Sequence, residues 1–342
     1  MKAVLIAEHG GLDRLELLDV AAPAPRPGEV LVRVKAAALN HLDLWVRRGV
    51  PGHKFPLPLI PGCDGAGVVE ALGAGVDGMA VGARVAIAPG VSCGRCEPCL
   101  RGDDALCRYF GILGETQNGT CAELVSIPAR NAIAIPEAMP FEQAAAVSLA
   151  FLTAWHMIVS RARVAAGETV LVHAGGSGVG SCAIQILKLL HATVITTVSS
   201  DAKVERARSL GADHVIDYQT RDFAEAVRAI TSKRGVDVVI DSVGADTFDR
   251  SIRSLTKGGR YVTCGATSGF ELKTDFRYVY FKSLSILGST MGGLHEVLAV
   301  WRHVAAGRLR PLLFKVLPLH EIAAAHRLLE DRTVFGKVVV TP

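Results

Sequence analysis

Four of the eight cysteines of this chain lie close together, in the order Cys93, Cys96, Cys99 and Cys107. Four thiolates at this spacing can wrap one tetrahedral zinc ion, and the glycines and proline between them permit the sharp turns that such a loop needs. The alternatives are an iron–sulfur cluster and reduced free thiols. A disulfide framework is disfavoured because the chain is long and is expected to be cytoplasmic. The spacing favours one structural zinc per chain. Four thiolates leave no open coordination position, so this zinc would fold the lobe and take no part in a reaction.

A glycine-rich turn, AGGSGVG over residues 174–180, follows an apolar run and precedes an apolar helix. Backbone N–H groups and the positive end of the helix dipole at such a turn attract a phosphate group. A tight turn alone would look similar, but the order strand, turn, helix and second strand favours dinucleotide binding. The residues expected to bind the cofactor here are Gly175, Ser177, Gly178, Val179 and Gly180.

The end of the next predicted strand bears on which dinucleotide is bound. NAD sites usually carry an acid there, about 20 residues further on, that accepts from the ribose 2′-hydroxyl. This strand ends at Ser199 and Ser200, followed by Lys203, with Tyr218 as a further candidate. Small hydroxyls and a lysine suit a 2′-phosphate, although Asp201 competes as an NAD-type acceptor and the serines also suit a helix N-cap. The pattern favours NADP(H) over NAD(H).

The first half of the chain is predicted to be mostly β. Short apolar runs bounded by glycine or proline predict strands over 30–34, 67–70, 84–88 and 123–127. Helices are expected after Leu39 and over 141–159, where alanine-rich helical spacing occurs.

From residue 168 onward, continuous apolar runs alternate with helical stretches. The predicted strands are 169–173, 192–198, 214–216, 236–241 and 260–264, and the predicted helices are 179–190, 202–210, 223–230 and 247–255. Continuous apolar strands separated by helices indicate a parallel sheet covered on both faces, in a doubly wound domain. Further along, 283–287 is expected to form the last strand of this sheet, 321–330 a helix and 337–340 a closing strand.

Composition excludes several classes of protein. The chain has 342 residues, 50% hydrophobic and 20% charged, which excludes disorder and suggests two domains. Its net charge of +4 is spread along the chain, so nucleic-acid or membrane-surface binding is not indicated. No apolar run reaches the roughly 18 residues of a membrane span. We therefore expect a soluble, cytoplasmic protein that acts on a small molecule.

Several motifs in a fixed order resemble one known family. They are Pro61–Val69 (PGCDGAGVV), the four-cysteine lobe, the Gly175–Gly180 turn, Asp241–Gly244 (DSVG), Leu287–Ser289 (LGS) and Gly336–Val339 (GKVV). Along essentially its whole length the chain resembles the medium-chain dehydrogenase/reductase superfamily, which includes zinc alcohol dehydrogenases and quinone oxidoreductases.

The resemblance implies an α/β protein of two domains. A GroES-like β domain would comprise 1–150 and 290–342, with the zinc lobe at 93–107, and a Rossmann domain with a doubly wound parallel sheet would comprise 151–289. It also implies that Ser242, Gly265, Gly288 and Ser289 belong to the cofactor site, and that hydride transfer takes place between the domains. A homodimer or homotetramer is expected through the apolar edge strand 283–287.

The sequence departs from the zinc alcohol dehydrogenases at their catalytic metal. Asn40 stands in place of a cysteine ligand, Cys63 in place of a histidine, and Leu149 at the third ligand position, while Leu42 replaces the proton-relay hydroxyl. A catalytic zinc needs about three protein ligands and an open position. An irregular site formed by Cys63, Asp64 and His41 remains an alternative.

Residues 39–49 look instead like the zinc-free quinone oxidoreductase pattern, Asn-x-x-Asp-x-aromatic-x-Arg-x-Gly. That group reduces quinones or activated alkenes with NADPH, but it carries no cysteine lobe, so this chain combines features of both groups. The resemblance assigns catalytic roles to Asn40, Asp43 and Trp45. Asn40 would donate to the substrate oxygen, Asp43 would orient the loop or Arg47, and Trp45 replaces a tyrosine that could donate a proton. Asn40 and Asp43 also suit local capping at a helix start.

The resulting hypothesis is an NAD(P)H-dependent oxidoreductase that transfers hydride to a quinone, an enone or another activated carbonyl compound. An alcohol is a poor hydride donor without a metal that stabilises its alkoxide, whereas an enone yields an enolate that hydrogen-bond donors can neutralise. One alternative is a zinc-type alcohol dehydrogenase acting on alcohols and aldehydes. A second is an NADPH-binding redox sensor without significant turnover.

Overall fold

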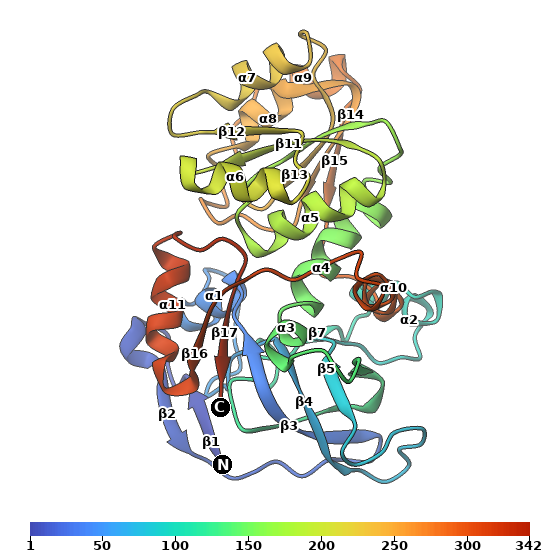
Figure 1. Ribbon diagram of the computed structural model, residues 1–342, viewed down its shortest axis with the longest axis vertical. Helices are drawn as coiled ribbons and strands as arrows, with labels where there is room; N and C mark the ends of the chain where they lie inside the picture. The colour runs from blue at the N-terminus through green and yellow to red at the C-terminus, as the bar shows by residue number, and fades with distance from the viewer. The chain divides into compact units, whose positions relative to one another are not determined.

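The chain forms two compact units, shown in Figure 1 as a computed structural model that describes residues 1–342. The first unit combines Met1–Ala150 with Gly292–Pro342, and the second is Phe151–Met291. The chain therefore leaves the first unit once and returns to it. The predicted return, at residue 290, lies two residues before the observed one.

A seven-stranded sheet organises the first unit, in the order β16-β17-β3-β4-β5-β9, with β8 also paired to β3. The strands of this unit are β1 (Lys2–Leu5), β2 (Glu16–Asp19), β3 (Glu29–Ala38), β4 (Asp64–Leu72), β5 (Arg84–Ile87), β6 (Gly90–Val91), β7 (Gly111–Ile112), β8 (Leu124–Pro128), β9 (Ala132–Ala134), β16 (Leu313–Pro318) and β17 (Lys337–Thr341). Each strand predicted in residues 1–150 is present. The long central strand β3 pairs with β4, β8 and β17, so it joins segments from both ends of the chain.

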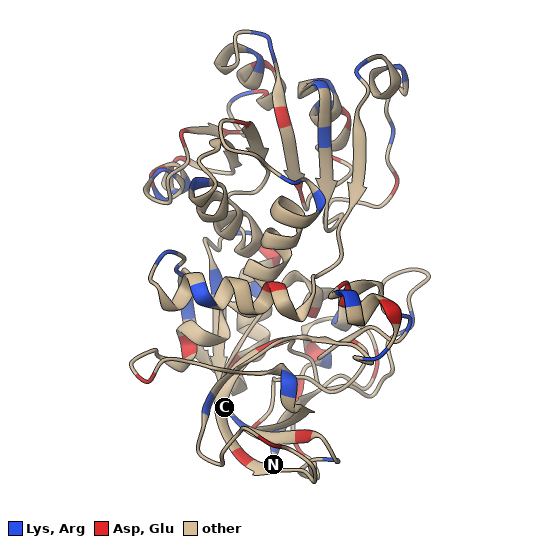
Figure 2. Cartoon of the chain, turned by 90° about the vertical axis from the view of Figure 1, so that its right-hand side faces the viewer, with Lys and Arg blue, Asp and Glu red and all other residues tan.

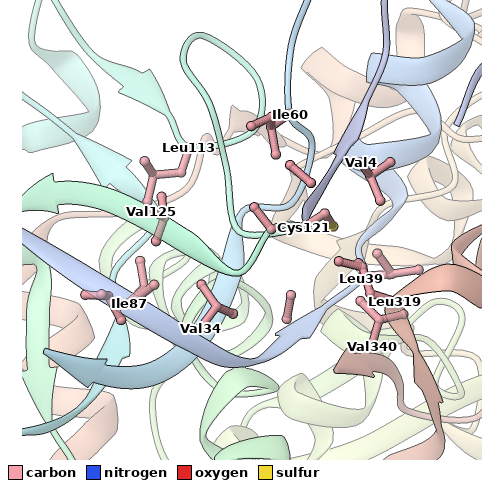
Figure 3. Packing of buried hydrophobic residues seen from close by; sticks show 14 of the residues in the cluster. Val4, Val34, Leu39, Ile60, Ile87, Leu113, Cys121, Val125, Leu319 and Val340 are labelled. Carbon is pink, nitrogen blue, oxygen red and sulfur yellow. The ribbon is translucent and has the colours of Figure 1, made fainter. Parts of the chain in front are cut away.

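The apolar side chains of these strands pack into one core. Figure 3 shows Val34, Ile87, Val125 and Val340 of four different strands directed toward a common interior. Cys121 lies in this core, fully buried, and burial raises the pKa of its thiol. This cysteine is therefore a packing residue.

The helices of the first unit are α1 (His41–Arg48), α2 (Glu97–Arg101), α3 (Phe141–Ala145), α10 (Leu294–Ala305) and α11 (Ile322–Glu330), while α4 (Ser148–Trp155) runs into the second unit. The sequence did not predict α10 or β16. The buried apolar residues of α10 (Val297, Val300, Trp301 and Val304) do recur at helical spacing, so this helix could have been predicted from its pattern.

The second unit is a six-stranded parallel sheet in the order β12-β11-β10-β13-β14-β15. Its strands are β10 (Thr169–Val172), β11 (Thr193–Val198), β12 (His214–Asp217), β13 (Val236–Asp241), β14 (Leu255–Thr263) and β15 (Ser285–Gly288). Its helices are α5 (Gly178–Leu189), α6 (Asp201–Ser209), α7 (Phe223–Ile230), α8 (Phe248–Ser254) and α9 (Arg277–Phe281). Strand order reverses between β10 and β13, as in a doubly wound fold. The α/β fold class is confirmed.

The single helix predicted over 141–159 is wrong in one respect. The segment is divided into α3, α4 and a π-helical turn, η4 (His156–Arg161). By length and composition, Phe141–Arg161 could also cross a membrane, contrary to the expectation that no segment reaches that length. However, 72% of its apolar window is buried inside the protein. It therefore has the character of a core segment.

Charged residues are interspersed along both units, and Figure 2 shows no face of one sign in its view.

Candidate active site and metal lobe

Asp64, the first residue of β4, links the positions at which the resemblance places catalytic-zinc ligands. Its Oδ2 accepts a hydrogen bond from Nδ2 of Asn40 (2.9 Å), and its Oδ1 accepts one from the backbone N–H of Leu149 (2.7 Å). The same Nδ2 of Asn40 lies 3.3 Å from Sγ of Cys63. These residues are buried, with Asp64 and Cys63 almost completely so. The three expected ligand positions thus belong to one hydrogen-bonded network.

The network contains a cation that the sequence analysis did not assign. Nζ of Lys337 lies 3.0 Å from Oδ2 of Asp64 and also donates to Oδ1 of Asn40. Strand register brings these residues together, because Ala38 of β3 is paired with Asp64 of β4 and with Val339 of β17. The ammonium group is almost fully buried, and it balances the Asp64 carboxylate in an environment where an unpaired charge would be costly.

Asn40 makes full use of its amide within this network. Its Nδ2 donates toward Asp64, Cys63 and the carbonyl oxygen of Ala38 (3.2 Å), and its Oδ1 accepts from Lys337. A hydrogen bond from Asn40 to a substrate oxygen would therefore require exchange of one of these partners. Direct donation to the substrate stays a prediction.

Asp43 fixes the start of α1. Its Oδ2 accepts from the backbone N–H of Asn40 (2.7 Å), and its Oδ1 accepts from the backbone N–H of Gly62 (3.0 Å). Asp43 therefore holds the segment that precedes Cys63, whereas Arg47 pairs with Glu330 of α11 and not with Asp43. A catalytic role for Asp43 stays a prediction. Burial raises the pKa of Asp43 to about 6.

His41 and Trp45 lie outside the network. Their rings pack edge to face, with 5.1 Å between the centroids, one turn apart on α1. Burial lowers the pKa of His41 to about 4. A metal site needs three or more His, Cys, Asp or Glu ligand atoms close together. Among all 342 residues, only the four cysteines of the lobe meet this condition. The structure thus does not assemble the alternative set of His41, Cys63 and Asp64.

The four cysteines of the lobe meet, as their spacing predicts. Their sulfur atoms all lie within 4.8 Å of one another, with 3.9 Å between Cys93 and Cys99 and 3.4 Å between Cys96 and Cys99. Tetrahedral zinc with Zn–S bonds of ~2.3 Å requires sulfur separations of about 3.8 Å. Backbone N–H groups of Arg95 and Cys96 lower the pKa of Cys93 to about 6, which favours the thiolate that a metal binds. These four residues fit a zinc ion.

In the second unit, the predicted cofactor residues follow the carboxyl ends of the parallel strands, and so they share one edge of the sheet. In strand order they are Tyr218 after β12, Ser199 and Ser200 after β11, the Gly175–Gly180 turn after β10, Ser242 after β13, Gly265 after β14, and Gly288 and Ser289 at the end of β15. This edge, at the reversal of strand order, is where dinucleotides bind in doubly wound sheets.

The glycine-rich turn is tightly packed. A Cβ at Gly180 would lie 2.2 Å from the carbonyl oxygen of Ala174, so the helix can approach the strand only with glycine there. Ser177 caps α5 by accepting the backbone N–H of Gly180 (2.9 Å). At the other end of the edge, the Oγ of Ser289 is buried and has no hydrogen-bond partner within the protein. An orphaned hydroxyl beside this edge fits a site completed by a cofactor.

The residues expected to distinguish NADP from NAD lie near one another at the ends of β11 and β12 and at the start of α6. The backbone N–H of Tyr218 donates to the carbonyl oxygen of Val198 (3.1 Å), which places Tyr218 beside Ser199 and Ser200. Ser200 is the N-cap residue of α6, but its side chain makes no capping hydrogen bond. Lys203 lies in the first turn of α6, where burial lowers the pKa of its ammonium.

Comparison with known proteins agrees with this geometry. Residues 26–137 match the Alcohol dehydrogenase GroES-like domain family, and residues 178–306 match the Zinc-binding dehydrogenase family. The chain is 33% identical to a 2-haloacrylate reductase of Burkholderia sp, over 99% of this chain and 98% of that protein. The chain belongs to the medium-chain dehydrogenase/reductase superfamily.

Other members resemble the whole chain as well. An alcohol dehydrogenase of Schizosaccharomyces pombe is 29% identical over 99% of this chain and 97% of its own length. The crystal structure of an NAD-dependent alcohol dehydrogenase superposes with a TM-score of 0.96, at 49% identity and with both chains fully covered. As a member of this superfamily, the protein is an oxidoreductase with a GroES-like domain and a Rossmann-type parallel sheet.

Two important residues were not found by sequence reasoning. Lys337 lies in the GKVV motif that marked the family resemblance, but only the strand pairing shows that it neutralises Asp64.

The second residue, Asp241 in the DSVG motif, is fully buried at the end of β13. Its carboxylate accepts from the backbone N–H of Val243 (2.6 Å) and the hydroxyls of Thr247 (2.6 Å) and Tyr261 (2.9 Å). Asp241 thus orders the turn that carries Ser242.

Proposed function

We propose that this protein is an NAD(P)H-dependent reductase that transfers hydride to a quinone, an enone or another activated carbonyl compound, with a structural zinc and no catalytic zinc. One observation carries the proposal. The three positions expected to hold catalytic-zinc ligands, Asn40, Cys63 and Leu149, belong to one hydrogen-bonded network. The carboxylate of that network, Asp64, is already paired with the buried ammonium of Lys337.

The chemistry of these positions is unsuited to zinc. Asn40 offers an amide that is already bonded, and Leu149 contributes only a backbone N–H to the network. The pKa of the Cys63 thiol is raised by burial, which disfavours the thiolate that a metal needs. The carboxylate of Asp64, which could otherwise bind a metal, is already paired with the positive charge of Lys337. A second cation beside Lys337 would be repelled.

This arrangement supports a proposal for the class of substrate. A bound nicotinamide would supply the hydride, and the protein would position the acceptor and stabilise developing negative charge on its oxygen. An enone or quinone needs no Lewis acid for this step, whereas an alcohol does. Similarity to a 2-haloacrylate reductase supports an activated alkene as the acceptor.

The second candidate is an alcohol dehydrogenase. It is favoured by the high similarity to an NAD-dependent alcohol dehydrogenase, at 49% identity.

For cofactor choice we propose NADP(H), because Ser199, Ser200 and Tyr218 adjoin one another and Lys203 lies within one helical turn of them. Asp201, exposed at the start of α6, is the feature that would favour NAD(H).

We further propose a homodimer or homotetramer formed through β15, and activity in the cytoplasm. β15 is the outermost strand of its sheet, and Ile286 on it is 45% exposed. An apolar edge strand of this kind is usually covered by a partner.

Metal content and paired assays test the proposed function. Purified protein is analysed for zinc per chain, then assayed for NADPH oxidation with benzoquinone and with a small enone, and for NAD⁺ or NADP⁺ reduction with primary alcohols. The proposal predicts one zinc per chain and turnover with the quinone or enone. Two tightly bound zincs with alcohol oxidation would overturn it in favour of the alcohol dehydrogenase. Tight NADPH binding without turnover on any acceptor would instead indicate a redox sensor.

A further inference from the structure

Asp104 connects the cysteine lobe to a distant part of the chain. Its Oδ1 accepts a hydrogen bond from Oγ of Ser92 (2.6 Å), and its Oδ2 accepts one from the backbone N–H of Leu294 (3.0 Å), 190 residues further along. Leu294 is the first residue of α10. One carboxylate therefore joins the lobe to the N-terminus of this helix, where the helix dipole favours a negative charge.

Ser92 and Asp104 both lie close in sequence to the proposed metal ligands. Ser92 directly precedes Cys93, and Asp104 opens a short 3₁₀ turn that leads to Cys107. A metal that binds Cys93 and Cys107 ties together the two ends of the lobe, and it thereby fixes Ser92 relative to Asp104. Without the metal, the contact between Cys93 and Cys107 is a weak one, from the backbone N–H of Cys93 to Sγ of Cys107 at 3.5 Å.

The backbones of the lobe and of α10 are also in close contact. A Cβ at Gly293 would lie 2.3 Å from the carbonyl oxygen of Gly102, so no side chain fits at this position. Gly102 ends α2 within the lobe, with a φ of +87°. Glu296 completes the junction by accepting the backbone N–H of Gly293 (2.8 Å). A displacement of the lobe would therefore be transmitted to the start of α10.

This junction lies where the chain returns from the second unit. β15 ends at Gly288, and only residues 289–293 separate it from α10. The proposed cofactor residue Ser289 is the first of these. Residues 289–293 therefore run from the proposed cofactor edge, at Ser289, to Leu294. The position of Leu294 fixes one end of this short segment.

We propose that Asp104 is a positioning residue that holds the start of α10 against the lobe, so that metal occupancy of the four cysteines controls the order of the return segment 289–293. The proposal rests on the zinc proposed for the lobe and is independent of which acceptor the enzyme reduces.

Hydrogen exchange of the full-length protein measures this coupling directly. Exchange of the peptide spanning 289–297 is followed by mass spectrometry in zinc-loaded protein and after removal of zinc with a chelator. Removal of zinc should speed exchange of this peptide about tenfold, since the hydrogen bond from Leu294 to a charged acceptor is released. Zinc-loaded Asp104→Ala should show the same acceleration while retaining its zinc, and removal of zinc from it should add no more.

Asp103→Ala is the matched control. Asp103 is the exposed neighbour of Asp104, and its carboxylate accepts only from Arg101, so exchange of 289–297 should match that of the wild type. Asp104→Asn retains the size of the side chain and one oxygen acceptor, and it replaces Asp104→Ala in the comparison if the alanine variant loses zinc. It should accelerate exchange to an intermediate extent.

A second readout concerns the cofactor. Titration of NADPH fluorescence should give a Kd that is raised several-fold in Asp104→Ala and unchanged in Asp103→Ala. In Asp104→Ala the segment that carries Ser289 must be ordered when the cofactor binds, and the entropy lost in ordering it weakens binding. The proposal is overturned if removal of zinc leaves exchange of 289–297 unchanged in the wild type, or if Asp104→Ala behaves as Asp103→Ala. Since hydrogen exchange needs no substrate, failure of the proposed reductase activity would leave this result unaffected.

Discussion

Asp64 and Lys337 form a buried ion pair, with 3.0 Å between Oδ2 and Nζ, although 273 residues separate them in the chain. The pair joins the first residue of β4 to the first residue of β17. It is the centre of the network that contains Asn40 and Leu149. Under the proposed function, this side-chain ammonium would supply the positive charge that zinc alcohol dehydrogenases obtain from a metal.

Replacement of Lys337 should destabilise the fold strongly. Lys337→Met leaves the Asp64 carboxylate buried without its cation, so we expect the free energy of unfolding to fall by about 3–5 kcal/mol. Urea denaturation measures this loss. Lys315→Met, at an exposed position on the neighbouring strand β16, should change stability by less than about 0.5 kcal/mol. In the double variant Asp64→Asn with Lys337→Met, the two losses should not add, because each removes the same interaction. Equal effects of Lys337→Met and Lys315→Met would contradict the assignment.

Asp43 should make stability fall as pH rises from about 4 to 6. Burial raises the pKa of Asp43 in the folded protein to about 6, so the unfolded chain loses this proton first and is favoured as pH increases. The contribution of Asp43 is therefore fully present below pH 4, is lost through pH 6, and amounts to roughly 3 kcal/mol over this range. The measurement is the difference in unfolding free energy between the wild type and Asp43→Asn at several pH values. This difference should be most favourable to the wild type at pH 4. A difference that is constant or grows with pH would disprove the effect.

The cysteine lobe should bind one zinc through Cys93, Cys96, Cys99 and Cys107. Cys96→Ser should abolish stoichiometric zinc, as judged by elemental analysis, because three thiolates bind the ion less tightly than four. Cys182→Ala, on α5 and outside the lobe, should retain one zinc per chain. Loss of zinc in both variants, or in neither, would exclude this assignment.

Lys203 should select the phosphorylated cofactor. Removal of its charge in Lys203→Ala should raise the Kd for NADPH by about tenfold and leave that for NADH nearly unchanged, since only NADPH carries the 2′-phosphate. Fluorescence titration with both cofactors provides the comparison, and Lys257→Ala, an exposed lysine on β14, is the control. A similar loss for both cofactors would show that Lys203 does not recognise the 2′-phosphate.

The edge strand β15 should carry the proposed subunit contact. Ile286→Lys places a charge on an exposed apolar position of this outermost strand and should convert the oligomer to a monomer in sedimentation velocity. Val316→Lys changes a similarly exposed residue on β16, the outermost strand of the other sheet, and should leave the oligomer intact. A wild-type monomer at micromolar concentration would refute the contact itself.

Local patterns in the sequence predicted much of the architecture. Between residues 169 and 241, every predicted strand and helix ends within one residue of its observed bounds. Continuous apolar runs and glycine punctuation are local properties, and they decide secondary structure when a strand is buried on both faces. The helix expected over 141–159 was less accurate, because alanine-rich spacing does not show where Ala146 interrupts α3 or where η4 begins.

The sequence by itself determined the four-cysteine lobe and the glycine-rich turn, since each depends on residues within one short loop. Only the tertiary structure decided that Lys337 neutralises Asp64 and that Asp104 holds the first N–H of α10. These contacts depend on strand register and on the approach of segments separated by 190 or more residues. Residue types along a chain do not specify such pairings, because any buried carboxylate could be satisfied by any cation or N–H group that the fold brings to it.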